Sequence, residues 1–306
     1  MNELQTTLND YLNFCKIQKR LDSKTLKAYR IDLNQFSEHV FADSISSIST
    51  AVLETYISSL HMAYKPKTVK RKIASLKAFF HYLEYRDLVV LNPFNKIQVK
   101  FREPATLPKT IPLYTVELFL SAMYTQCKDA KTPCQKMYVL RDIAVIELLF
   151  STGMRISELC SLKPSDIDLY DRTVLIFGKG SKERKIQIGN DDVVDVLKKY
   201  AQEFHSKIKD CGYFFINRLN QRLSEQSVRN MIQKYASFAS IDLHITPHMF
   251  RHTFATSLLE ADVDIRYIQE MLGHSSINVT EIYTHVAMAK QKDILTTKHP
   301  RKDFRL

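Results

Sequence analysis

The chain has 306 residues, 45% of them hydrophobic, and a formal net charge of +11 from 44 Lys and Arg against 33 Asp and Glu. This length allows two domains, and the basic excess favours a polyanionic partner, either nucleic acid or an acidic membrane surface. No apolar run approaches the ~20 residues that span a bilayer, and the first residues lack a signal-peptide pattern, so membrane attachment loses support. The five cysteines are odd in number and form no C-x-x-C pair, which predicts reduced thiols and a cytoplasmic protein.

Residues 1–100 are predicted to be entirely helical. Asp22 or Ser23 can cap a helix over TLKAYRIDLNQFSEHV, and a second helix is predicted over STAVLETYISSLHM. The clearest pattern lies in KPKTVKRKIASLKAFFHYLEY, where apolar side chains recur at spacings of three and four and form one helix face: Val69, Ile73, Leu76, Phe80 and Leu83.

The other faces of that last helix are strongly basic, and no acidic residue occurs between Thr55 and Leu83. A solvated basic surface is the ordinary alternative. The lack of neighbouring carboxylates instead favours a helix that follows phosphates. The candidate DNA-binding residues on it are Lys67, Lys70, Arg71, Lys72 and Lys77.

A proline-rich stretch, NPFNKIQVKFREPATLPKTIP, follows with little apolar periodicity and is predicted to contain an extended linker. We therefore expect a helical domain at 1–100, a linker at 101–112 and a second domain at 113–306. In the second domain, TVLIF and RKIQI flank GKGSKE, which predicts an antiparallel hairpin with a lysine-bearing tip. The surrounding segments have helical patterns. The predicted fold is mainly α, with one small antiparallel sheet.

The stretch HMFRH at residues 248–252 has the histidine spacing of a helical zinc site. The metalloprotease motif H-E-x-x-H carries a glutamate base where this chain has Met249. Arg251 would repel a cation, whereas a guanidinium beside an imidazole suits a phosphate. We therefore expect no metal. A zinc hydrolase using His248, His252 and His274 is the weakest alternative.

Four separate motifs carry candidate chemistry: TGMRISEL, GKGSKER, TPHMFRHTFAT and LGHSSINVTEIYTH. Each is weak alone, because a lone arginine or lysine is usually solvated and a lone histidine or tyrosine is usually packed. Glu158, one turn after the first arginine, could merely form an ion pair with it. The signal is the set and its order along the chain: Arg155, Lys179, His248, Arg251, His274 and Tyr283.

This ordered set resembles the tyrosine recombinase (phage integrase) family, and within it the Xer-type enzymes. The resemblance covers nearly the whole chain, and its motifs are most specific in the second half. It implies an N-terminal SAM-like helical domain that clamps DNA, a linker, and a catalytic domain whose C-terminal tail contacts a neighbouring protomer. The family's Arg, Lys, His-x-x-Arg, His and Tyr fall on the six residues above.

On a DNA phosphodiester these residue types have definite uses. The phenol of Tyr283 can attack phosphorus and form a 3′-phosphotyrosyl bond, and because its ordinary pKa is about 10 it needs a base, for which His248 is suited. Arg155 and Arg251 can hold the non-bridging oxygens, with His274 as a further donor. In the family the lysine, here Lys179, is the general acid for the leaving 5′ oxygen. Glu158 is expected to orient an arginine, and no cofactor is expected.

The expected partner is a double-stranded recombination site, because the phosphotyrosyl bond lets strands rejoin to new partners without ATP. Exchanging two duplexes needs four cuts and hence a tetramer on two sites, which could include a paralogous recombinase or an accessory protein. The alternatives are a type IB topoisomerase, which uses the same chemistry, and a non-catalytic DNA-binding regulator. Chromosome dimer resolution, integration or excision of a mobile element, and cointegrate resolution all remain open at this point.

Overall fold

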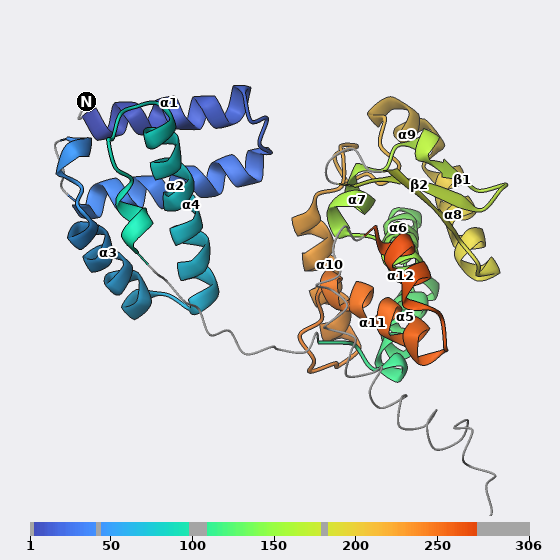
Figure 1. Cartoon of the computed structure of the whole chain (residues 1–306). Helices are drawn as coiled ribbons and strands as arrows, with labels where there is room; N and C mark the ends of the chain where they lie inside the picture. The colour runs from blue at the N-terminus through green and yellow to red at the C-terminus, as the bar shows by residue number, and fades with distance from the viewer. Residues whose placement is uncertain (1–2, 41–43, 98–108, 179–182, 274–306) are drawn as a thin grey trace, which may run out of the picture. The chain divides into compact units, whose positions relative to one another are not determined.

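The computed structural model describes residues 3–40, 44–97, 109–178 and 183–273 (Figure 1). Its two compact units lie within Met1–Ala105 and Thr106–Leu306. Across the described residues, no helix combines the length and the apolar character that crossing a bilayer requires.

The described residues of the first unit form four helices and two short 3-10 turns around an apolar core. The Asp22 carboxylate accepts hydrogen bonds from the backbone N–H groups of Lys24 and Thr25 and so caps the second helix. The Ser49 hydroxyl accepts from Val52 N and caps the third. The elements are α1 Glu3–Ile17, α2 Ser23–Val40, η1 Ile45–Ser47, α3 Thr50–Ala63, α4 Pro66–Tyr85 and η2 Pro93–Lys96.

The apolar face predicted for α4 is buried in this core: Val69, Ile73, Leu76, Phe80 and Leu83 are each no more than 3% exposed. Phe80 makes edge contacts with Phe36 of α2 and Phe94 of η2. Because one face of α4 is buried against α1, α2 and α3, its apolar residues recur at helical spacing, and that spacing predicted the helix.

Lys72, which was predicted to lie on the basic face of α4, is buried instead. Lys72 is 3% exposed, and its Nζ lies 3.1 Å from Oδ1 of Asp32, a fully buried carboxylate on α2 that also accepts from Ser75 Oγ at 2.9 Å. The assignment of Lys72 to a DNA-facing surface is therefore wrong. The reason is geometric, since position 72 lies beside the apolar face and α2 supplies the acid that the local sequence lacks. Arg71 also pairs with Asp32, although its side chain is 46% exposed.

The second unit surrounds one buried helix. The helix α6, Pro133–Thr152, is buried at nearly every position from Val139 to Leu149 and packs against α5, α8 and α11 (Figure 1). The other elements are α5 Leu113–Lys128, α7 Ile156–Ser161, η3 Pro164–Asp166, α8 Asp191–Glu203, α9 His205–Cys211, α10 Glu225–Phe238, α11 Pro247–Glu260 and α12 Ile265–Leu272.

A three-stranded antiparallel sheet lies between η3 and α8, in the order β1, β2, β3. Its strands are β1 Ile167–Asp168, β2 Thr173–Phe177 and β3 Glu183–Gln187. The predicted hairpin is confirmed, with Ile176 opposite Arg184 in its register. In this register Ile176 of β2 is buried in the core, and the side chain of Arg184 on β3 reaches α7 and α12.

The end of the predicted linker is anchored to the second unit. Ile111 is 2% exposed in the core of that unit, and its backbone N–H donates to Thr253 Oγ1 of α11 at 2.8 Å. The chain is thus already fixed two residues before α5 begins.

Candidate functional site

Arg155 stands in a sharp turn between α6 and α7. The turn begins with Gly153, whose φ of +58° is left-handed, and a Cβ there would lie 2.5 Å from Cδ1 of Phe254. Both constraints favour glycine, and they explain the G in TGMR. The turn places Arg155 at the N-cap of α7 with its side chain 36% exposed. The guanidinium therefore remains open to an anion.

Glu158, one turn into α7, holds this arginine. One carboxylate oxygen accepts from the backbone N–H of Arg155 at 2.8 Å, and the other accepts from its Nη1 at 2.9 Å. The Glu158 side chain is 6% exposed. Burial would raise its pKa, but hydrogen bonds from Arg184 and Arg155 outweigh burial and hold the pKa below its ordinary value. Glu158 is therefore an anchored carboxylate.

Arg251 connects three of the four motifs. This residue of α11 is 5% exposed, and its Nη1 donates to the carbonyl of Gly153 at 2.8 Å while its Nη2 donates to the carbonyl of Leu272 at 2.7 Å. The first carbonyl belongs to the turn that carries Arg155. The second belongs to the last residue of α12, directly before the glycine and histidine of the LGH motif. One guanidinium thus joins segments that are far apart in sequence.

His248 lies in the first turn of α11, three residues before Arg251. Partial desolvation of the ring lowers its pKa, and the positive charges of Arg251, Arg155 and Arg229 lower it further. The imidazole is therefore neutral near pH 7 and can accept a proton. His248 therefore interacts electrostatically with both candidate arginines, Arg155 and Arg251.

Two arginines of this cluster were missed by sequence reasoning. Arg229 of α10 acts on His248 and pairs with Glu225 of its own helix at 3.2 Å. Arg184 of β3 is bound to Glu158 at 2.7 Å. Arg184 ends the GKGSKER motif but was given no role there, and Arg229 lies in none of the four motifs, because only packing brings either side chain to the site.

His252, the second histidine of HMFRH, is half-buried. Its Nδ1 has no hydrogen-bond partner among the described residues. Burial lowers its pKa, as do His248 and Arg251. Within the described ranges no three His, Cys, Asp or Glu side chains gather in a metal-ligand arrangement. His274, which the zinc alternative also requires, lies outside those ranges.

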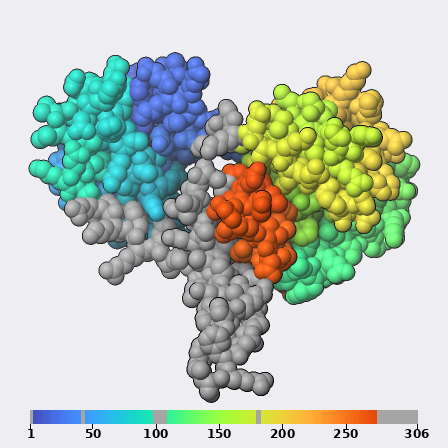
Figure 2. Space-filling view, turned by 45° about the vertical axis from the view of Figure 1, so that its right-hand side comes forward, coloured from blue at the N-terminus to red at the C-terminus, as the bar shows by residue number. Residues whose placement is uncertain are grey.

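The candidates Lys179, His274 and Tyr283 also fall outside the described residues. By sequence, Lys179 belongs to the connection between β2 and β3, and His274 directly follows Gly273 at the end of α12. Figure 2 shows α12, in orange-red, against the yellow segment that contains β3, in agreement with the contact between these elements.

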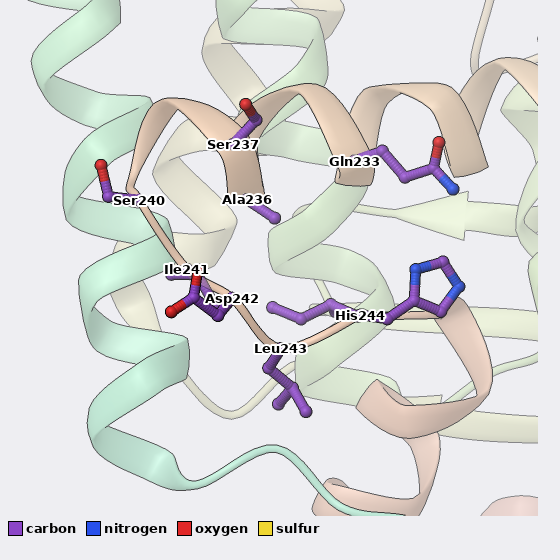
Figure 3. Close-up of a pocket in the computed structure, with 9 residues that line it drawn as sticks. Gln233, Ala236, Ser237, Ser240, Ile241, Asp242, Leu243 and His244 are labelled. Carbon is purple, nitrogen blue, oxygen red and sulfur yellow. The ribbon is translucent and has the colours of Figure 1, made fainter.

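A pocket of about 370 Å³ lies elsewhere, between the end of α10 and the loop that leads to α11 (Figure 3). Its lining includes Gln233, Ser237, Asp242 and His244, and none of the predicted site residues. Arg155, His248 and Arg251 lie outside this pocket, and the positive charges of the two arginines suit an oxyanion.

Two family comparisons match the chain. Residues 120–290 match the phage integrase family, and residues 8–87 match the phage integrase N-terminal SAM-like domain. The two ranges fall in the two compact units.

Curated relatives match over nearly the full length. A tyrosine recombinase of Agathobacter rectalis is 64% identical, with 99% of each chain covered. Tyrosine recombinase XerD of Listeria monocytogenes is 36% identical, covering 98% of this chain and 100% of that protein. Among solved structures, the XerH site-specific recombinase in a post-cleavage complex with its palindromic difH substrate aligns with a TM-score of 0.74, covering 93% of this chain and 83% of that one at 23% identity. At that identity the last match shows a shared fold.

Proposed function

This chain belongs to the phage integrase family and is a tyrosine recombinase, an enzyme of site-specific DNA recombination, and from that premise we propose how its own residues divide the reaction. Tyr283 attacks the scissile phosphate, the 5′ oxygen leaves, and the strand is held as a 3′-phosphotyrosyl ester until another 5′ hydroxyl reverses the step. The observation that carries the proposal is the guanidinium of Arg251, which joins the TGMR turn to the end of α12.

The two arginines neutralise the transition state. Charge grows on the non-bridging oxygens as the phenol approaches phosphorus, and fixed guanidiniums stabilise it without reorganisation. Arg155 is the more exposed of the two, and Glu158 holds it in place. Arg251 is held by two carbonyls. These anchors are the reason for assigning both arginines to phosphate rather than to solvent.

His248 is the proposed base, and desolvation together with the three charges around it keeps it neutral. Lys179 is proposed as the acid that protonates the leaving 5′ oxygen, and His274 as a further donor to the phosphate. Fixed cations take the place that a metal ion has in other phosphoryl-transfer sites, so no cofactor is proposed.

The proposal is tested with a nicked suicide substrate and the purified protein in excess EDTA, without nucleotide. A covalent protein–DNA band joined to the 3′ phosphate is expected, because the protein supplies every charge the step needs. A strict divalent-ion requirement for cleavage would return the site to metal chemistry. A paired-site synapsis assay then separates recombination from topoisomerase-like relaxation, and a non-catalytic regulator would give neither band nor synapsis.

The pH dependence follows from the lowered pKa of His248. As a base the imidazole works only when neutral, so the single-turnover cleavage rate should rise with pH through an inflection below about 6.5 and then level off. Arg229→Ala removes one of the charges that lower this pKa, and it should move the inflection upward.

The control for this shift is Arg172→Ala. Arg172 is also an arginine paired with an acid, Asp191, but it is not among the charges that act on His248. An inflection that Arg229→Ala leaves in place would remove His248 from the role of base.

The N-terminal unit is proposed to clamp DNA through the exposed lysines of α4, with Lys72 now excluded. Replacing Lys67, Lys70 and Lys77 by alanine should flatten the plot of log affinity against log salt by about 0.9 for each phosphate that is no longer neutralised. Replacing the same three by arginine keeps the charges and should restore the wild-type slope. An alanine variant with an unchanged slope would leave this face as an ordinary solvated surface.

The proposed assembly is a tetramer on two double-stranded sites, because one tyrosine cuts one strand and exchange requires four cuts. The segment after Tyr283 is proposed to contact a neighbouring protomer, and residues 101–112 to link the domains at 1–100 and 113–306. The proposed reaction is Xer-like dimer resolution or the integration, excision or resolution of a mobile element, in the cytoplasm, with a paralogous recombinase as a second partner. An accessory protein remains part of the proposal.

A further inference from the structure

Arg184 of β3 contacts two other elements, α7 and α12. Its Nη2 and Nη1 donate to the two carboxylate oxygens of Glu158 at 2.7 and 3.2 Å, and its Nε donates to the carbonyl of Met271 at 2.8 Å. The side chain starts on β3, reaches α7 and ends against the last turn of α12. It is 9% exposed, so water competes little for these bonds.

Glu158 is held from two sides. One of its oxygens accepts from Nη1 of Arg155 and Nη1 of Arg184, and the other accepts from the backbone N–H of Arg155 and Nη2 of Arg184. This fork fixes the rotation of the carboxylate. Without Arg184, only the two bonds from Arg155 would hold the carboxylate, so the orientation of Glu158 and of the Arg155 guanidinium would be less constrained.

The end of α12 is held in the same way. The carbonyls of Met271 and Leu272 are acceptors that the helix itself leaves unpaired, and Arg184 takes the first while Arg251 takes the second. The next residue, Gly273, has a φ of +64°, and a Cβ there would lie 3.0 Å from Nη1 of Arg184. Glycine at this position therefore both ends the helix and leaves room for the guanidinium.

We propose that Arg184 is a positioning residue that sets Arg155 and Arg251 in register for one phosphate. It acts on Arg155 through Glu158, and on the end of α12 through the carbonyl beside the one that Arg251 holds. This inference rests on the proposed function, because it presumes that the two arginines neutralise the transition state. Each of the three guanidinium nitrogens of Arg184 donates to a protein acceptor, so Arg184 is not assigned to DNA.

The first test uses cleavage of the suicide substrate by the full chain at saturating DNA. Arg184→Ala should slow cleavage by about 100-fold, the effect of a misplacement near 1 Å, with unchanged DNA affinity. The decrease should be equal on a normal substrate and on one with sulfur as the bridging 5′ atom, because transition-state charge is unneutralised in both. Selective rescue by sulfur would overturn the proposal, since it would mean that Arg184 acts on leaving-group protonation.

The second test is a double-mutant cycle with Glu158→Gln. If Arg184 acts through Glu158, the double variant should be no slower than the slower single variant, within about threefold. Multiplying effects would show independent roles and contradict the proposal. Arg184→Lys keeps the charge but not the fork, and its rate should fall between those of alanine and wild type.

Arg222→Ala is the matched control. Its Nε also donates to a backbone carbonyl at 2.8 Å, that of Cys160 at the other end of α7, and no bond joins it to Glu158 among those of the described residues. The variant should lower the melting temperature by loosening α7, yet leave cleavage within about threefold of wild type. An equal decrease in the rate of Arg222→Ala would mean that any loosening of α7 suffices, and it would overturn the proposal.

The same cleavage assay distinguishes this inference from the proposed function. If wild type forms no covalent complex, the proposed function fails. If wild type cleaves and Arg184→Ala cleaves equally well, only the positioning role of Arg184 fails.

Discussion

Tyr283→Phe is expected to abolish the covalent protein–DNA band while leaving affinity for the recombination site unchanged. The change removes one hydroxyl, which is the group proposed to attack phosphorus, and keeps the ring that fills the same space. Among the described residues, no other hydroxyl is proposed as the nucleophile. The measurement combines denaturing gel analysis of the suicide-substrate reaction with a binding titration at fixed salt.

Tyr267→Phe on α12 is the matched control. Tyr267 lies 16 positions before Tyr283 in the sequence and is 62% exposed, and its hydroxyl makes no bond to the arginine cluster among the described residues. It should form the covalent band at the wild-type level. A band that persists in Tyr283→Phe and disappears in Tyr267→Phe would assign the nucleophile to Tyr267 and contradict the proposal.

Variants of the two arginines and of Lys179 are expected to respond differently when the leaving group changes from oxygen to sulfur. Arg155→Ala and Arg251→Ala should each slow cleavage by about 10²–10³-fold on both the oxygen and the 5′-sulfur substrate, because the charge on the non-bridging oxygens remains. Lys179→Ala should be slow with oxygen and largely rescued with sulfur, a leaving group that needs little protonation. The readout is the single-turnover rate with each substrate.

Arg251→Ala has a second consequence that the controls must separate. Its guanidinium also bridges the carbonyls of Gly153 and Leu272, so part of the decrease could come from loosening of α12. Arg251→Lys keeps a charge but cannot bridge both carbonyls, and it should remain severely impaired on both substrates.

If Lys179→Ala gains nothing from sulfur, the lysine binds DNA instead of donating a proton.

Several features could be predicted because they depend on local periodicity or on chemical type. The apolar spacing of Val69, Ile73, Leu76 and Phe80 predicted α4, since a helix face must be apolar to be buried. The TVLIF and RKIQI runs predicted the hairpin. The ordered set of Arg, Lys, His-x-x-Arg, His and Tyr resembles the tyrosine recombinase family, and that resemblance indicated phosphoryl transfer to a tyrosine.

Other features were decided by contacts between segments far apart in sequence. Lys72 has nearly the same local composition around it as Lys70, but α2 places Asp32 beside it, and the side chain is buried. Arg184 ends the GKGSKER motif but was given no role there, and Arg229 lies in none of the four motifs, yet packing of β3 and α10 brings them to Glu158 and His248.

By itself, the sequence predicted the helical architecture from residue spacing, and it indicated the reaction class and the candidate residues through its resemblance to the tyrosine recombinase family. The tertiary structure alone decided which cations are solvated and which are held in place by protein acceptors. A cationic side chain is held in this way when a carboxylate or a carbonyl that a helix end leaves unpaired approaches it from another element. For Arg251 and Arg184 those groups are the carbonyls at the end of α12 and the carboxylate of Glu158, and no local pattern in the chain announces either meeting.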